Sequence, residues 1–93
     1  MSDNIKKDVR ERIADFLVLP KEVVLDYPKI LLIGNTQITI ENYRGIVEYD
    51  SQKIRINTEK GIIKILGDKL EINTVTIEEI NISGIISNVE FIS

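Results

Sequence analysis

Near the N-terminus, hydrophobic residues recur at spacings of four, four, three and one, which places them on one face of a helix. The opposite face is charged, and Ser2 or Asp3 can cap the start of the helix. Pro20 ends it, because the residue before a proline avoids the α region. The pattern therefore predicts an N-terminal amphipathic helix over residues 1–18. Its apolar face consists of Ile5, Val9, Ile13, Phe16 and Leu17.

Three roles are open for this predicted helix. The favoured one is that it lies on the rest of the domain and buries its apolar face there. The second is that it docks on a partner. Binding to a membrane surface is the weakest alternative, because the polar face carries both signs of charge rather than an excess of lysine and arginine.

After the helix, hydrophobic and polar residues alternate with the period of two that is typical of half-buried strands. About seven or eight short strands are expected, at spacings of about 8–12 residues. This indicates an antiparallel β-sandwich or rolled sheet, with a β-solenoid as the alternative, because the second half looks quasi-repetitive. The predicted strands are 29–33, 36–41, 46–49, 53–58, 62–66, 70–73 and further segments around 75–82 and 86–92.

Glycine and asparagine mark the predicted turns between these strands. A two-residue hairpin turn is expected at Gly34-Asn35, and a turn over 42–45 needs a positive φ at Gly45. Further turns are expected to end at Gly61 and to lie at 67–68 and 83–84. Residues 19–93 are thus predicted to be an all-β region, which together with the helix forms a single domain of 93 residues.

Composition supports this fold class and excludes several kinds of chemistry. Isoleucine occurs 19 times, which favours strands, whereas aromatic residues make up only 5%. The chain has no cysteine and no histidine, so thiolate chemistry and the commonest general base are missing. The adjacent acids Glu78 and Glu79 would point to opposite faces of a strand. We therefore expect a non-enzymatic protein with no catalytic residues, no cofactor and no metal site.

The net charge of −3 argues against nucleic acid as a partner, because phosphate binding needs clustered basic residues. The longest apolar runs are too short to span a membrane, so no direct membrane insertion is expected. No signal peptide is visible, and a cytosolic location is the default expectation.

Two features could contact a protein partner. Asn42, Tyr43 and Arg44 place an amide, an aromatic ring and a guanidinium in one predicted turn, and Tyr and Arg are enriched in binding hot spots. Ile62 and Leu66 form a second apolar face on a strand whose other face is also apolar. The strand at 29–33 is likewise apolar on both faces. One face must be covered by the helix, by a partner or by another copy, so homo-oligomerisation is also plausible.

One stretch, Tyr27 to Gly45, carries the most specific part of a resemblance to the YabP/YqfC family of sporulation proteins, and to its YqfC branch in particular. Turn glycines and alternating aliphatic residues extend the similarity to Phe91. The residues that carry it are Leu19-Pro20, Asp26, Pro28, Ile33-Gly34, Glu41-Asn42 and Gly45, then Gly61, Ile65, Gly67, Leu70, Ile72, Glu79, Ile82, Gly84, Ile86, Val89 and Phe91.

The resemblance implies a small protein of endospore-forming Firmicutes, made in the mother cell, with no known catalytic activity. It implies a membrane protein of the YqfD type as a partner. An adaptor or assembly factor is therefore expected, located in the mother-cell cytoplasm or peripherally at the forespore membrane. The YabP branch is associated with the spore coat, so a self-assembling structural protein of the coat layers is the alternative.

Overall fold

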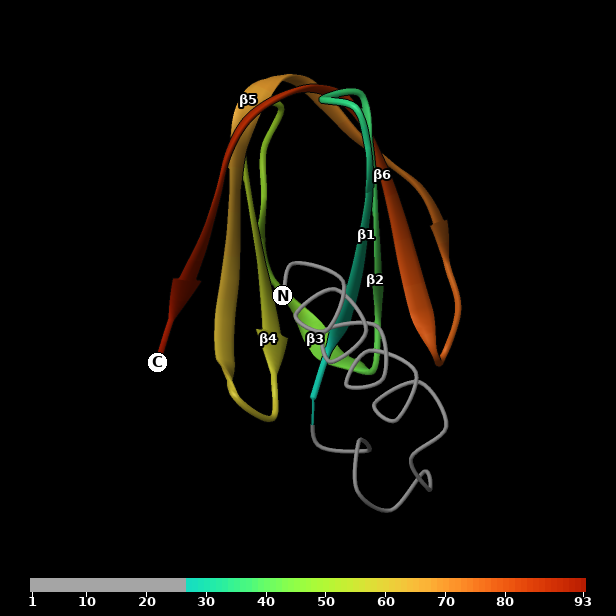
Figure 1. Cartoon of the computed structure of the whole chain (residues 1–93), viewed down its shortest axis with the longest axis vertical. Helices are drawn as coiled ribbons and strands as arrows, with labels where there is room; N and C mark the ends of the chain where they lie inside the picture. Colours follow the sequence, from blue (N-terminus) through green and yellow to red (C-terminus); the bar gives the residue numbers. More distant parts are fainter. Residues whose placement is uncertain (1–26) are drawn as a thin grey trace, which may run out of the picture.

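The computed structural model describes residues 27–93, which form six β-strands (Figure 1). The predicted N-terminal helix lies outside the described residues, and so does most of the connector that follows it. Isoleucine recurs at alternate positions in four of the six strands, as expected for a sheet with one buried face. The strands are β1 (Lys29–Ile33), β2 (Gln37–Glu41), β3 (Tyr43–Tyr49), β4 (Lys53–Thr58), β5 (Gly61–Val75) and β6 (Glu79–Ile92).

All six strands belong to one antiparallel sheet in the order β1-β2-β6-β5-β4-β3. Two short hairpins, β1–β2 and β3–β4, flank a long central pair, and the first hairpin pairs with β6 while the second pairs with β5. Figure 1 shows β5 and β6 arching over one end of the molecule, so that the sheet folds back on itself. The mainly β, antiparallel character predicted from the sequence is confirmed. The solenoid alternative is wrong, because all neighbouring strands here are antiparallel.

The predicted number of short strands is wrong, because two expected turns lie inside long strands. Gly67 and Asp68 lie within β5, which has 15 residues, and Ser83 and Gly84 lie within β6, which has 14. Register shifts of the β5–β6 ladder occur beside Gly67 and Asp68, as in β-bulges. Bulges and turns favour the same residue types, so the sequence pattern does not distinguish them.

Gly84 shows why the bend needs glycine. Its φ is +140°, and a Cβ there would lie 2.7 Å from the carbonyl oxygen of Lys69 on the neighbouring strand. Lys69 itself has a φ of +52°, an uncommon value for a residue other than glycine. The backbones of the two long strands thus lie close together at the bend.

The loops of the two hairpins form hydrogen bonds with β6 and β5 at the positions where these long strands bend. In the β1–β2 loop, the carbonyls of Asn35 and Thr36 accept hydrogen bonds from the backbone N–H groups of Ile86 (2.7 Å) and Gly84 (3.1 Å). In the β3–β4 loop, the carbonyls at positions 51 and 52 accept hydrogen bonds from the N–H groups at positions 70 (2.8 Å) and 67 (3.1 Å). Backbone groups that the bulges release from the ladder thus find partners in the loops.

One hydrophobic core lies inside the folded sheet. It contains alternate residues from β2, β4, β5 and β6, and eight isoleucine side chains are almost completely buried. Isoleucine is stiff and packs well on a pleated surface, which explains how so few aromatic residues suffice. The buried hydrophobic residues are Ile38, Ile40, Ile54, Ile56, Ile63, Ile65, Leu70, Ile80, Ile82 and Ile86.

Two predicted turns differ in detail. The β1–β2 loop has three residues rather than two, since Ile33 pairs with Gln37. The turn expected over 42–45 is reduced to Asn42, which has a φ of +63°, whereas Gly45 lies within β3 without a positive φ. Asparagine tolerates this region because its short polar side chain hydrogen-bonds locally. Gly61, where a turn is expected to end, has a φ of +118° and begins β5.

Candidate functional site

The two sides of the folded sheet are closed differently. On one side, the Tyr43 hydroxyl donates a hydrogen bond to the carbonyl oxygen of Thr76 (2.6 Å). The Tyr49 hydroxyl accepts one from the backbone N–H of Ile72 (3.0 Å). Both tyrosines belong to β3, so they join this edge strand to the last part of β5 and its following residue. We call this pair of bonds the tyrosine clasp.

Strand β1 forms the other edge of the sheet and has no such closure among the described residues. It pairs only with β2, over five consecutive positions without a bulge. Leu31, Leu32 and Ile33 are 56%, 48% and 54% exposed. Natural edge strands are commonly protected by bulges, charges or proline. Strand β3 has two register shifts, whereas β1 is regular and apolar, so β1 is the edge better suited to pairing with another chain.

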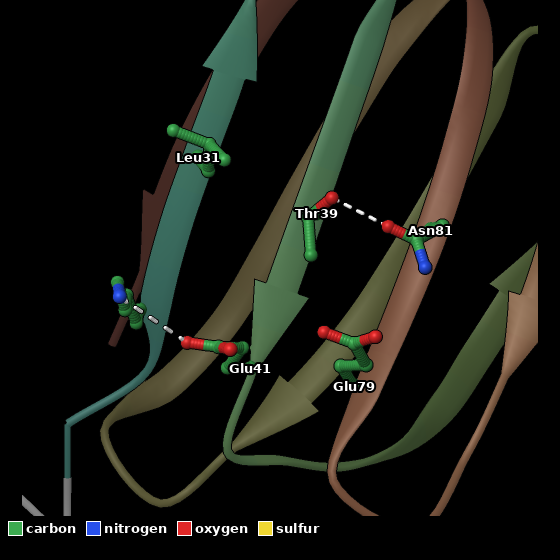
Figure 2. Close-up of a pocket in the computed structure, with 6 residues that line it drawn as sticks. Leu31, Thr39, Glu41, Glu79 and Asn81 are labelled. Atoms are coloured by element: carbon green, nitrogen blue, oxygen red, sulfur yellow. Dashed lines mark hydrogen bonds and ion pairs between the residues drawn. The ribbon is translucent and has the colours of Figure 1, made fainter.

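Beside β1, the outer face of the sheet has a shallow depression of about 250 Å³ (Figure 2). The Lys29 Nζ lies 3.7 Å from a Glu41 carboxylate oxygen, and the Thr39 hydroxyl donates to the side-chain oxygen of Asn81. Glu41 and Glu79 are directly paired across β2 and β6, and Figure 2 shows their carboxylates on the same face. The depression is lined by Lys29, Leu31, Thr39, Glu41, Glu79 and Asn81.

The chemistry available in this depression is limited. Two carboxylates and one ammonium group can accept or donate hydrogen bonds to a polar or cationic group. Among residues 27–93, no group of three or more acidic side chains is placed to hold a metal ion. The volume also lies below the range of about 300–1,000 Å³ that is usual for small-molecule pockets. The depression is therefore small for a ligand pocket, and its polar groups are accessible from the outer face.

Of the residues predicted to bind a partner, Asn42 and Tyr43 have hydrogen bonds within the fold. The Asn42 side-chain amide donates to the carbonyl of Tyr27 (3.0 Å), and its backbone N–H donates to the carbonyl of Glu78 (2.8 Å). Tyr43 is half-buried, packs against the core and forms part of the clasp. These contacts give both residues a structural role.

Arg44, Ile62 and Leu66 lie on the surface. Arg44 is exposed and forms an ion pair with Glu59. Ile62 and Leu66 are half-buried and lie on β5, on the face opposite the core residues Ile63 and Ile65. In the strand order, only β4 separates their strand, β5, from β3, which carries Arg44. That these residues contact a partner stays a prediction, and the same holds for Asn42 and Tyr43.

The sequence pattern did not identify the tyrosine clasp or the paired carboxylates. Glu41 and Glu79 lie 38 positions apart, and Tyr49 and Ile72 lie 23 positions apart. Such pairs depend on the register between distant strands, which alternation alone does not define. The only local signal was that two of the three tyrosines of the chain, Tyr43 and Tyr49, fall on the same strand.

Residues 27–93 form a mainly β fold whose exposed features include an apolar edge strand and a polar depression beside it. The chain belongs to the YabP family, which it matches over residues 26–93. This membership suggests a sporulation-associated protein. No match was found among the curated proteins or the solved structures with which the chain was compared.

Proposed function

We propose that this protein is a non-enzymatic adaptor or assembly factor of sporulation. In this proposal it acts in the mother cell of an endospore-forming Firmicute, as a member of the YqfC branch, and binds a membrane protein of the YqfD type. Membership of the YabP family supports the link to sporulation. Within residues 27–93, no helix is long and apolar enough to cross a membrane. The proposal therefore places the chain at the forespore membrane through its partner.

The observation that carries this proposal is the open edge of β1. An edge strand offers unpaired N–H and C=O groups, and an extended segment of a partner can add to it as a further strand. Leu31 and Ile33 project on the outer face beside the polar depression. Main-chain hydrogen bonds would supply affinity, and these side chains with Lys29 and Glu41 would supply specificity. Arg44, Ile62 and Leu66 are proposed as additional contacts.

Site-specific crosslinking in sporulating cells tests this proposal. A photoreactive amino acid at Leu31 is expected to capture the membrane partner. The same group at Asp50, an exposed position in the turn between β3 and β4, is the matched control and is expected to capture little. Equal capture from both positions, or capture from Asp50 alone, would contradict a partner site on β1.

The alternative function is a structural protein that self-assembles in the spore coat. It is favoured by the same regular, apolar edge, because β1 of a second copy could pair there and continue the sheet. This alternative predicts oligomers whose size rises with concentration. Sedimentation of the purified full chain would decide the matter, since a strict monomer at high concentration contradicts self-assembly and leaves the adaptor proposal standing.

A further inference from the structure

Several apolar side chains lie on the core face of the sheet but remain exposed, among them Ile46 on β3 and Val75 on β5. The two on β1 and β6 are Leu32 and Phe91. Leu32 pairs with the buried Ile38, and Phe91 pairs with the buried Ile63. Directly paired residues of antiparallel strands lie on the same face. Leu32 and Phe91 therefore belong to the core face, yet they are 48% and 71% exposed. The core is incompletely covered at these two positions.

Both residues lie on strand segments that have a neighbour on one side only. Strand β1 pairs with β2, and residues 88–92 of β6 pair with β5. The tyrosine clasp joins β3 and β5, whereas no hydrogen bond between side chains joins β1 to the end of β6 among residues 27–93. We call the surface formed by Ile30, Leu32, Val89 and Phe91 the open side of the core. Ile30 and Val89 are half-buried and pack against the core cluster.

We propose that residues 5–17 of the same chain cover the open side of the core. In this arrangement the segment is a helix, and its apolar stripe packs on Leu32 and Phe91. Its charged face then points to solvent. This inference goes beyond the adaptor function, because it concerns how the chain completes its own core.

The length of the segment and the point where it joins the described chain support this occupant. Thirteen helical residues extend about 20 Å, which is close to the length of a strand of six or seven residues. The described chain begins at Tyr27, next to β1, and the Tyr27 carbonyl is held by the Asn42 side chain at 3.0 Å. The Lys60 ammonium lies 4.8 Å from the centre of the Tyr27 ring. The tether thus starts at a fixed point beside the open side.

The tether also favours the chain's own segment over a second copy. Residues 18–26 can span up to about 30 Å when extended, so the stripe can reach either strand. Attachment through a short stretch of chain gives an effective concentration in the millimolar range, well above that of a free second copy in dilute solution. The stripe supplies five apolar side chains, and the residues that it would cover are apolar as well.

Disulfide trapping tests this docking directly, because the natural chain has no cysteine. Val9→Cys, Ile13→Cys and Phe16→Cys are each combined with Phe91→Cys in the full chain. The matched controls combine each stripe cysteine with Asn57→Cys, an exposed position on β4. On mild oxidation in dilute solution, at least one Phe91 pair is expected to form an intramolecular disulfide about tenfold faster than its control, since docking raises the local concentration. Equal rates, or disulfide-linked dimers alone, would overturn the proposal, and dimers would identify a second copy as the occupant.

Hydrogen exchange of the full chain provides a second test without cysteines. Ile13→Lys places a charge in the apolar stripe, whereas Asp15→Lys changes the polar face. The stripe variant is expected to raise amide exchange at Leu32 and Phe91 about tenfold, because local opening becomes easier. The amide of Ile56 in the core should exchange as before, which shows that the sheet stays folded. Unchanged exchange in Ile13→Lys, or an equal rise in Asp15→Lys, would contradict docking of the stripe.

Discussion

The Tyr49 hydroxyl accepts a hydrogen bond from the backbone N–H of Ile72 at 3.0 Å, and thereby joins the edge strand β3 to the last part of β5. This N–H is on the side of β5 that has no neighbouring strand at that point. The bond therefore satisfies a backbone group that would otherwise be open to pairing. Together with the Tyr43–Thr76 bond, it joins β3 to the end of β5 on this side of the folded sheet, whereas β1 has no such closure among the described residues.

Tyr49→Phe is the first test of this closure. The substitution keeps the ring but removes the acceptor for the Ile72 N–H. Because Tyr49 is 53% exposed, water can replace part of the lost bond, so the free energy of unfolding should fall by about 0.5–1 kcal/mol. Denaturant unfolding measures this change, and amide exchange of Ile72 should accelerate. Unaltered exchange at Ile72, with the Ile56 amide as internal reference, would show that the bond does not protect this edge.

Replacing glycine by alanine at two positions tests whether the bend of the sheet needs glycine there. A Cβ at Gly67 would lie 2.1 Å from the carbonyl oxygen of Ile85, whereas a Cβ at Gly45 would meet nothing within 4 Å. Neither residue has a positive φ, so the two differ mainly in space. Gly67→Ala should destabilise the protein by about 2 kcal/mol or more, since backbone must shift to relieve the overlap. Gly45→Ala should change stability by less than about 1 kcal/mol. Thermal and denaturant unfolding of both variants would check this, and similar losses in the two would contradict a close approach at the bend.

The loss of stability on shortening an isoleucine should depend on how deeply its side chain is buried. Ile82 is completely buried, whereas Ile77 is 93% exposed in the loop before β6. Ile82→Ala should cost about 2–5 kcal/mol, because it removes buried methyl groups and leaves a cavity. Ile77→Ala should stay within about 0.5 kcal/mol of the natural protein. Denaturant unfolding measures both changes in the free energy of unfolding. A large loss of stability for Ile77→Ala would contradict the exposure of this side chain.

The alternation of isoleucine residues was enough to predict the antiparallel sheet and its core face. Ile38, Ile40, Ile54 and Ile56 are buried as the alternation predicts. The path of the sheet could not be predicted in the same way. The bend at Gly67 depends on a hydrogen bond to the carbonyl of Gln52, which comes from another hairpin. Local turn propensity does not predict hydrogen bonds to residues that are distant in the sequence.

The candidate site was even less accessible to sequence analysis. The apolar run at β1 correctly indicated a strand that is apolar on both faces, because it needs only local alternation. The depression beside it combines side chains from β1, β2 and β6, and its paired acids Glu41 and Glu79 face each other only through the β2–β6 register. Asn42 and Tyr43 also form hydrogen bonds within the fold, which turn composition does not show.

Substitution of Arg44 can distinguish an effect on partner binding from an effect on stability. It forms an ion pair with Glu59, and the two side chains are 61% and 43% exposed. An exposed pair of this kind contributes about 0–1 kcal/mol, so Arg44→Ala should leave unfolding almost unchanged. If Arg44 contacts the partner, Arg44→Ala should nevertheless reduce capture of that partner from sporulating cells. Glu59→Ala is the matched control, because it breaks the same ion pair and keeps the guanidinium. Loss of capture in Arg44→Ala but not in Glu59→Ala would assign the contact to the guanidinium, whereas unchanged capture in both would remove Arg44 from the binding surface.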